Sequence, residues 1–180
     1  MNKALFLDRD GVINLDQGYV FRKNDFIPIE GICDLIKKAK ENDYYVICIT
    51  NQSGIARGYF SHKDFYSFMN HINEYIFRKT NYYLDGVYMC PHHPTEVNSI
   101  YTKSCNCRKP AAGLFREALR DYTIDPKKSI MIGDKHSDLL AAKQVNIETR
   151  IFYSQKKSVP QKDFIYTQQF KSHKEILNYI

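Results

Sequence analysis

The amino-acid sequence predicts an α/β fold, a doubly wound and mostly parallel β-sheet with helices on both faces. Short apolar, β-rich segments alternate along the chain with segments whose apolar residues recur at helical spacing. The segment "YYVICIT" (44–50) is apolar on both faces, as a central parallel strand is. The chain has 180 residues and contains no internal repeat or linker, so we expect one domain over residues 1–180.

The same alternation places the individual elements. Strands are expected at 3–7, 44–50, 85–90, 129–134 and 149–153. Helices are expected at about 30–42, 62–79, 113–122, 138–145 and 172–179. Ser61 should cap the helix at 62–79, with Asp64 in its first turn. Residues 91–110 have no clear period, and the tail 154–170 reads as irregular with a short edge strand at 164–167.

Composition and charge narrow the class of partner. The net charge is +6, but the basic residues are scattered, which favours a small anionic ligand over nucleic acid. No apolar run reaches the ~20 residues that cross a bilayer, and the N-terminus has no signal-peptide layout. We therefore expect a cytoplasmic monomer without a membrane or nucleic-acid partner. A zinc-stabilised nucleic-acid-binding module is the alternative from another class.

Polar side chains follow the expected strands where parallel strands end together. Ligands of such sheets bind beyond the carboxyl ends of the strands. Carboxylates can hold Mg²⁺ or act as nucleophiles, and hydroxyl, amide and lysine donors suit phosphoryl oxygens. The pattern therefore predicts phosphoryl transfer. The residues concerned are Asp8, Asp10, Thr50, Asn51, Gln52, Arg108, Lys109, Asp134 and Lys135.

These motifs carry a family resemblance from about Leu5 to Tyr153. "FLDRDGV", "TNQSG", "CRKP" and "GDKHSD" resemble, in order, the four motifs of the haloacid dehalogenase superfamily of aspartate-nucleophile phosphatases. More closely, "LDRDGVIN", "GYV", "TNQSGIARG", "CPHHP", "CNCRKP" and "MIGDK" resemble the D,D-heptose 1,7-bisphosphate phosphatases. That subgroup is shared with histidinol phosphatases. The resemblance implies a haloacid-dehalogenase-like fold, and no insertion in the chain is large enough for a separate cap domain.

The resemblance also implies roles for the catalytic residues. Asp8 would be the nucleophile, and Asp10 would protonate the leaving oxygen and later deprotonate the attacking water. Thr50 and Lys109 would hold the transferring phosphoryl group. Asp8, the backbone carbonyl of Asp10, and Asp134 would bind Mg²⁺.

A cysteine-rich loop at about 90–110 is a candidate zinc site. Cys90, His92, Cys105 and Cys107 supply three thiols and one imidazole, which suits tetrahedral structural Zn²⁺. The resemblance implies the same four ligands, and His93 is a rival to His92. Zinc would clip the loop and fix the residues that follow Cys107. The other two cysteines read as core residues, and the remaining histidines, at 62, 71, 136 and 173, read as surface or helix residues.

The substrate expected from the resemblance is a small phosphosugar. It implies Mg²⁺-dependent hydrolysis of the 7-phosphate of D-glycero-D-manno-heptose 1,7-bisphosphate through an aspartyl phosphate, in nucleotide-activated heptose biosynthesis for bacterial surface glycans. Histidinol phosphate is the alternative, and the sugar anomer stays open. Lys135 replaces a second acid of many relatives, which favours a strongly anionic substrate. Asp138 reads equally as an acid that supports the metal ligands from behind or as a helix cap. The expected substrate contacts are Arg9, Asp16, Gln17, Gly18, Tyr19, Asn51, Gln52, Ser53, Arg108 and Lys135.

Overall fold

The computed structural model describes residues 1–95, 100–154 and 165–180, and these form one parallel sheet in the order β3-β2-β1-β4-β5-β6. The predicted doubly wound parallel sheet is therefore confirmed. The strands are β1 (Lys3–Leu7), β2 (Tyr44–Asn51), β3 (Gly86–Cys90), β4 (Ile130–Gly133), β5 (Thr149–Tyr153) and β6 (Gln168–Phe170).

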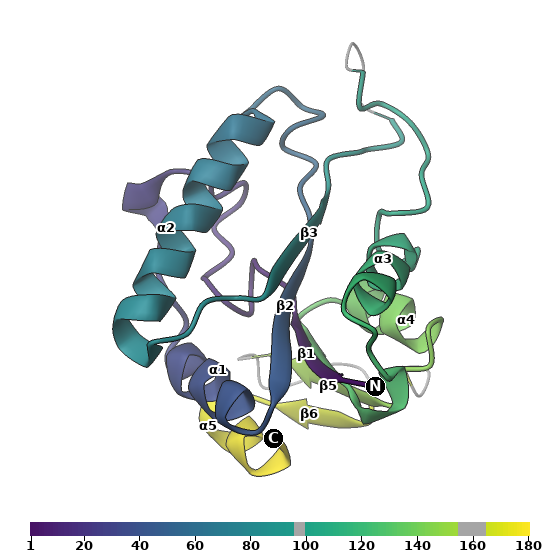
Figure 1. The fold of residues 1–180 in the computed structure, drawn as a ribbon. Coiled ribbons are helices and arrows are strands. Elements are labelled where there is room, and N and C mark those ends of the chain that lie inside the picture. Colours follow the sequence, from purple (N-terminus) through teal and green to yellow (C-terminus); the bar gives the residue numbers. More distant parts are fainter. Residues whose placement is uncertain (96–99, 155–164) are drawn as a thin grey trace.

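Helices cover both faces of the sheet, as Figure 1 shows. One face carries α1 (Ile32–Glu41), α2 (His62–Thr80) and α5 (His173–Ile176), and the other carries α3 (Gly113–Asp121) and α4 (His136–Lys143). Short 3-10 turns lie at Lys23–Asp25, Pro126–Lys128 and Leu177–Tyr179. Within β1, Leu5 and Leu7 enter the core under α1 and α2, whereas Ala4 and Phe6 enter the opposite core. A strand buried on both faces reads as a continuous apolar run, which is why the sequence located it.

The longest helix begins as the sequence predicted. The Ser61 hydroxyl accepts a hydrogen bond from the backbone N–H of Asp64, and the Asp64 carboxylate accepts one from the Ser61 N–H at 2.8 Å. This reciprocal capping box satisfies two backbone donors that a helix N-terminus otherwise leaves unpaired. It fixes where the 51–61 connection ends and α2 begins.

Two expected elements differ from the structure. Helix α4 begins at His136, two residues before the expected start, because the Asp138 carboxylate accepts the Lys135 N–H at 3.0 Å and caps the helix. The prediction of an edge strand at 164–167 is wrong for the described residues 165–167. The edge strand of the sheet is β6, at Gln168–Phe170. Ile165 is buried in the core instead, so packing overrides its β propensity. The rest of the expected irregular tail, 155–164, lies outside the described residues.

His173, read from the sequence as a surface or helix residue, is the first residue of helix α5 and is buried. Its side chain is fully buried, its ring stacks on Tyr153 with a centroid distance of 4.5 Å, and Nδ1 lies 3.1 Å from the Glu30 carbonyl. Burial lowers the pKa of His173 from 6.5 to about 4. The folded C-terminal segment therefore resists protonation of this ring, whereas an undocked segment accepts the proton near pH 6.5.

Acidification is therefore expected to loosen β6 and α5 before the rest of the sheet. Between pH 6.5 and 4 the docked state should lose up to about 1.4 kcal/mol per pH unit. Hydrogen exchange of residues 168–180, corrected for the intrinsic rate at each pH, measures this loss. His173→Gln should remove the pH dependence, and protection that stays constant from pH 7 to 4.5 in the wild type would contradict the expectation.

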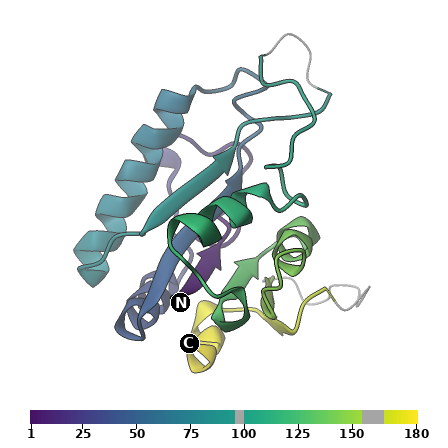
Figure 2. The ribbon, with the colours of Figure 1, turned by 45° about the vertical axis from the view of Figure 1, so that its right-hand side comes forward.

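The fold brings the functional motifs to one edge of the sheet. The strand order reverses between β1 and β4, and ligands of open α/β sheets bind at that point beyond the carboxyl ends of the strands. The 51–61 connection and the cysteine-rich loop rise from the same end of the sheet (Figures 1 and 2). In the described part of the chain, no helix combines the length and apolarity that a membrane span requires.

Candidate active site

Asp8, Lys109 and Asp138 form a buried group of charges at the ends of β1 and β4. Lys109 Nζ lies 3.0 Å from Asp8 Oδ1 and 2.7 Å from Asp138 Oδ1, and all three side chains are at most 7% exposed. The same Nζ donates to the Ile49 carbonyl at 2.7 Å. Burial would by itself lower the pKa of Lys109, but Asp138 and Asp8 outweigh it and raise that pKa above its usual value. The lysine is therefore a fixed cation beside Asp8.

The protonation of Asp8 depends on the balance of these neighbours. Burial raises the pKa of Asp8; Lys109 lowers it, and the charge of Asp138 raises it further. The Arg9 backbone N–H also donates to Asp8 Oδ1 at 2.8 Å. An ionised Asp8 is thus held by two donors on one oxygen.

Asp134 completes a cluster of carboxylates that fits a divalent cation. Single oxygen atoms of Asp8, Asp134 and Asp138 lie within 4.8 Å of one another. Burial, and next the charge of Asp8, raise the pKa of Asp134 to about 7, and its buried Oδ1 has no hydrogen-bond partner among the described residues. Oxygen ligands of this kind suit Mg²⁺, whose charge would offset their repulsion. Gly11, at φ 87°, leaves room for the Asp134 carboxylate, which a Cβ at that position would overlap.

Asp10 lies apart from the cation cluster, in a ring of hydrogen-bond donors. Its Oδ1 accepts from Arg9 Nε at 3.1 Å and from Asn14 Nδ2 at 3.0 Å, and its Oδ2 accepts from Gln52 Nε2 at 3.1 Å. Gln52 Nε2 also donates to Thr50 Oγ1 at 2.8 Å. The structure therefore links Asp10 to the end of β2 through one amide group.

Arg9 differs from its predicted place among the substrate contacts. Its side chain is fully buried beneath the site and does not line the cleft. The reason is that Arg9 lies in a turn just beyond β1, where its guanidinium packs over the rings of Phe65 and Phe68 on α2. Arg9 therefore faces the core under α2, where it contacts Asp10 and not the cleft.

An open cleft of about 610 Å³ is lined by Asp10 and Lys109, whereas the predicted catalytic residues Asp8, Thr50 and Asp134 do not line it. Every predicted substrate contact except Arg9 and Gln17 lines it. Gln17 is exposed on the same loop but outside the lining. The lining residues are Asp10, Asp16, Gly18, Tyr19, Asn51, Gln52, Ser53, Gly54, Arg108, Lys109, Pro110, Lys135 and Ser137.

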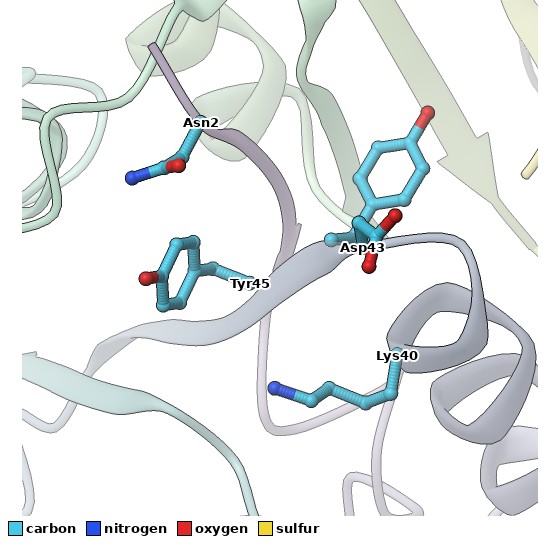
Figure 3. Close-up of a pocket in the computed structure, with 5 residues that line it drawn as sticks. Asn2, Lys40, Asp43 and Tyr45 are labelled. Atoms are coloured by element: carbon cyan, nitrogen blue, oxygen red, sulfur yellow. The ribbon is translucent and has the colours of Figure 1, made fainter.

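Figure 3 shows a second hollow, at the opposite end of the sheet. It has a volume of about 340 Å³ and is lined by Asn2, Lys40, Asp43, Tyr44 and Tyr45. Its lysine is already paired, because Lys40 Nζ lies 2.6 Å from Asp85 Oδ1. None of the carboxylates of the cation cluster reaches this hollow, so the cleft beyond the strand ends is the candidate site.

Two contacts shape the walls of the cleft. Asn51 and the backbone of Lys109 exchange hydrogen bonds, since Asn51 Nδ2 donates to the Lys109 carbonyl and the Lys109 N–H donates to Asn51 Oδ1, each at 3.0 Å. Across the mouth, Lys135 Nζ lies 3.0 Å from Asp16 Oδ2. Burial would lower the pKa of Lys135, but Asp134 and Asp8 outweigh it and raise that pKa. Lys135 therefore stays cationic in the mouth of the cleft.

The four predicted zinc ligands lie together in the cysteine-rich loop. Cys107 Sγ lies 3.1 Å from Cys90 Sγ and 3.2 Å from Cys105 Sγ, and His92 Nδ1 lies 3.2 Å from Cys107 Sγ. Ligand atoms around tetrahedral Zn²⁺ are about 3.5–3.8 Å apart, so this cluster needs only a small expansion to form a zinc shell. Three sulfurs and one nitrogen are the donor set of a structural zinc site.

His93 lies outside this cluster. Its Nε2 is 3.5 Å from Arg57 Nη2, and its Nδ1 accepts from the Thr95 N–H at 3.4 Å. The geometry therefore favours His92 over its rival. The carbonyl of His92 also accepts a hydrogen bond from Arg108 Nη1 at 3.2 Å, which joins the cluster to the cleft.

Two residues of the site were not singled out as site residues by the sequence. Asp138 caps α4 with one oxygen and pairs with Lys109 through the other, so its reading as a helix cap is confirmed, and its reading as an acid of the metal site stays a prediction. Asn14 is fully buried and donates to Asp10. Each stands in a motif that the sequence analysis quoted, Asp138 in "GDKHSD" and Asn14 at the end of "LDRDGVIN", and these motifs were the signals for both.

Comparisons with known proteins agree with this fold and identify the family. Residues 106–162 match the family model described as HAD-hydrolase-like. Together with the parallel sheet and the buried aspartates at its edge, this match indicates a hydrolase of the HAD-like class.

Relatives of known name narrow the class. The chain is 43% identical over 157 residues to the D-glycero-beta-D-manno-heptose-1,7-bisphosphate 7-phosphatase of Haemophilus ducreyi, covering 87% of this chain and 86% of the relative. It is 40% identical over 177 residues to the D-glycero-alpha-D-manno-heptose-1,7-bisphosphate 7-phosphatase of Campylobacter jejuni, covering 98% and 95%. The crystal structure of D,D-heptose 1,7-bisphosphate phosphatase from B. bronchiseptica, complexed with magnesium and phosphate, superposes with a TM-score of 0.81 at 27% identity, covering 98% and 97%. The chain therefore belongs to the heptose-1,7-bisphosphate 7-phosphatase family.

Proposed function

We propose that this protein hydrolyses the 7-phosphate of D-glycero-D-manno-heptose 1,7-bisphosphate through an aspartyl phosphate on Asp8. The observation that carries the proposal is the buried Asp8–Lys109–Asp138 group, whose lysine lines a cleft that Asp10 also lines. The names of the relatives support the substrate. The reaction would serve nucleotide-activated heptose biosynthesis for bacterial surface glycans, in the cytoplasm.

In the first half of the proposed reaction, a carboxylate oxygen of Asp8 attacks phosphorus and the bond from phosphorus to the sugar oxygen breaks. Asp10 gives its proton to that leaving oxygen. Lys109 lies 3.0 Å from Asp8 and would stabilise the negative charge of the transferring group. Thr50, at the end of β2, would donate a hydrogen bond from its hydroxyl to a phosphoryl oxygen.

In the second half, water attacks the same phosphorus and gives a proton to Asp10. The bond from phosphorus to Asp8 breaks, which releases phosphate and restores both aspartates. Asp8, Asp134 and the backbone carbonyl of Asp10 would hold Mg²⁺, which supplies charge neutralisation for phosphoryl oxygens when bound. The unpartnered buried Oδ1 of Asp134 supports that assignment.

The cleft itself suits a doubly phosphorylated sugar. Arg108 and Lys135 add two cations to Lys109 along its walls, and Arg108 can bind a second phosphate through its fork of donors. Asp16, Gly18, Tyr19, Asn51, Gln52 and Ser53 would contact sugar hydroxyls. All of these groups come from one chain, so we propose an open site without a separate cap domain in a monomer.

The experiment that tests this function is phosphate release, with Mg²⁺ present, from both anomers of heptose 1,7-bisphosphate and from histidinol phosphate. We expect release from a heptose anomer, with the 1-phosphate left in the product. The preferred anomer shows whether the enzyme shares the specificity of the relatives named for the alpha sugar or of those named for the beta sugar. Preference for histidinol phosphate would overturn the substrate and keep the mechanism, whereas no release from any of the three would overturn both.

We propose that Cys90, His92, Cys105 and Cys107 hold a structural Zn²⁺. Burial raises the pKa of the Cys90 thiol, so only a bound cation would keep it deprotonated at neutral pH. The zinc would hold Arg108 in place through the carbonyl of His92. It would thereby support substrate binding without taking part in the chemistry.

Cys105→Ser is expected to reduce the zinc content and to raise KM more than it lowers kcat. Loss of a charge-assisted contact from Arg108 would raise KM on the order of tenfold. Metal analysis of the purified protein and steady-state kinetics measure the two effects. Cys33→Ser, outside the cluster, is the matched control and should keep both the zinc and the KM. An unchanged zinc content in the Cys105→Ser protein would contradict this site.

A further inference from the structure

Arg9 is a fully buried cation between the two aspartates that follow β1. Its side chain is 0% exposed, and its guanidinium carbon lies 5.7 Å and 5.2 Å from the ring centroids of Phe65 and Phe68 on α2. Arginine is almost never fully buried unless it is paired, because removing its charge from water is costly. The buried guanidinium of Arg9 therefore requires hydrogen-bonding partners that offset the cost of removing its charge from water.

Those partners are the Asp10 carboxylate and a backbone carbonyl. Arg9 Nε and Nη2 donate to Asp10 Oδ1 at 3.1 Å and 2.9 Å, and Nη2 lies 2.7 Å from Asp10 Oδ2. The same Nη2 donates to the carbonyl of Val20 at 2.7 Å. A planar fork with several donors fixes the orientation of a carboxylate, which a single ammonium group does not. Arg9 thus sets the plane of the Asp10 carboxylate and ties it to the end of the 14–20 loop.

The contacts of Asp10 are unequal at its two oxygens. Oδ1 accepts from both Arg9 nitrogens and from Asn14, whereas Oδ2 accepts from one Arg9 nitrogen and from Gln52. Asp10 and Gln52 line the cleft, and Arg9 does not. Oδ2, which faces Gln52, therefore accepts fewer hydrogen bonds than Oδ1 and is the oxygen better able to carry a proton. Because Arg9 does not reach the cleft, any effect of Arg9 on the reaction must pass through Asp10.

We propose that Arg9 is a positioning residue that holds Asp10 Oδ2 toward the cleft for transfer of its proton to the leaving oxygen. This inference rests on the proposed function, in which Asp10 is the proton donor. The proton moves from Asp10 to the sugar oxygen as the bond from phosphorus to that oxygen breaks. A leaving group that needs no proton does not depend on this step.

The test compares two leaving groups in the first turnover of Arg9→Met. Methionine is unbranched and apolar, so it suits the space between Phe65 and Phe68. With heptose 1,7-bisphosphate, whose alkoxide must be protonated, the rate of leaving-group release should fall about 100-fold. With acetyl phosphate, whose acetate leaves unprotonated, the fall should stay within about threefold. An equal loss with both substrates would overturn the positioning role.

A double-mutant cycle separates an action through Asp10 from a general one. In an Asp10→Asn background, Arg9→Met should cause no further loss with the sugar phosphate. Lys40→Met is the matched control, because it also breaks a partly buried ion pair, in the hollow at the far end of the sheet (Figure 3). It should lower the two rates equally or leave them unchanged. An added loss in the Asp10→Asn background would overturn the proposal.

Two further measurements keep the positioning role testable if Arg9→Met does not fold or if the proposed function is wrong. Arg9→Lys keeps the charge and most of the stem, but its single ammonium does not reproduce the fork, so it should show a smaller loss of the same selectivity. If the wild type cleaves neither substrate, the proposed function fails. In that case the crystal structure of the Arg9→Met protein tests the positioning role without any activity measurement. Asp10 should move away from Gln52, and an unchanged 3.1 Å contact would overturn the inference.

Discussion

Asp8→Asn is expected to lower phosphate release by at least about 10⁴-fold, because an amide does not form the aspartyl phosphate. The folded state should be as stable as the wild type or more so. Burial raises the pKa of Asp8, which means that its charge is costly in this place, and Asp138 would still pair with Lys109. Steady-state kinetics and thermal unfolding at pH 7 measure the two effects.

Asp43→Asn is the matched control for Asp8→Asn. Asp43 lies at the far end of the sheet with φ 59°, a conformation that asparagine adopts readily. It should keep full activity and stability. Turnover by the Asp8→Asn protein within tenfold of the wild type would overturn the nucleophile assignment, and a large loss of stability would contradict the account of the buried charges.

Lys109→Met is expected to remove both activity and a large part of the stability. The change leaves Asp8 and Asp138 buried without their shared cation, and breaking such a pair from one side costs about 3–5 kcal/mol. In a chain of this size that corresponds to a fall in Tm of about 10 °C. Differential scanning calorimetry and phosphate release measure the loss, and the exposed Lys128→Met serves as the control.

The double variant Asp8→Asn with Lys109→Met tests the cause of that instability. Removing one unpaired carboxylate should recover part of the lost Tm, because the remaining repulsion is smaller. A double variant less stable than Lys109→Met alone would indicate that the lysine acts through packing of its stem rather than through its charge. The predictions for Asp8→Asn and Lys109→Met together separate the catalytic role of these side chains from their electrostatic effect on stability.

The local sequence pattern was sufficient to predict most helices and strands and the polar residues that follow the strands. The strand at 3–7 and the capped start of α2 depend on neighbours in the sequence, and both were predicted correctly. The parallel topology then required Asp8, Thr50 and Asp134 to meet at one edge. The zinc ligands followed from residue types and from the family resemblance, and their spacing alone left His93 open.

What the sequence determined by itself was the order of elements, the family, and which polar residues reach the edge of the sheet. Those properties depend on periodicity and on motifs, which are local. The tertiary structure alone decided that Arg9 lies under α2 instead of in the cleft, that Asp138 shares Lys109 with Asp8, and that His173 is buried against Tyr153. Each depends on contacts between distant segments, since the energy of a buried charge or ring is set by the groups packed around it and not by its neighbours along the chain.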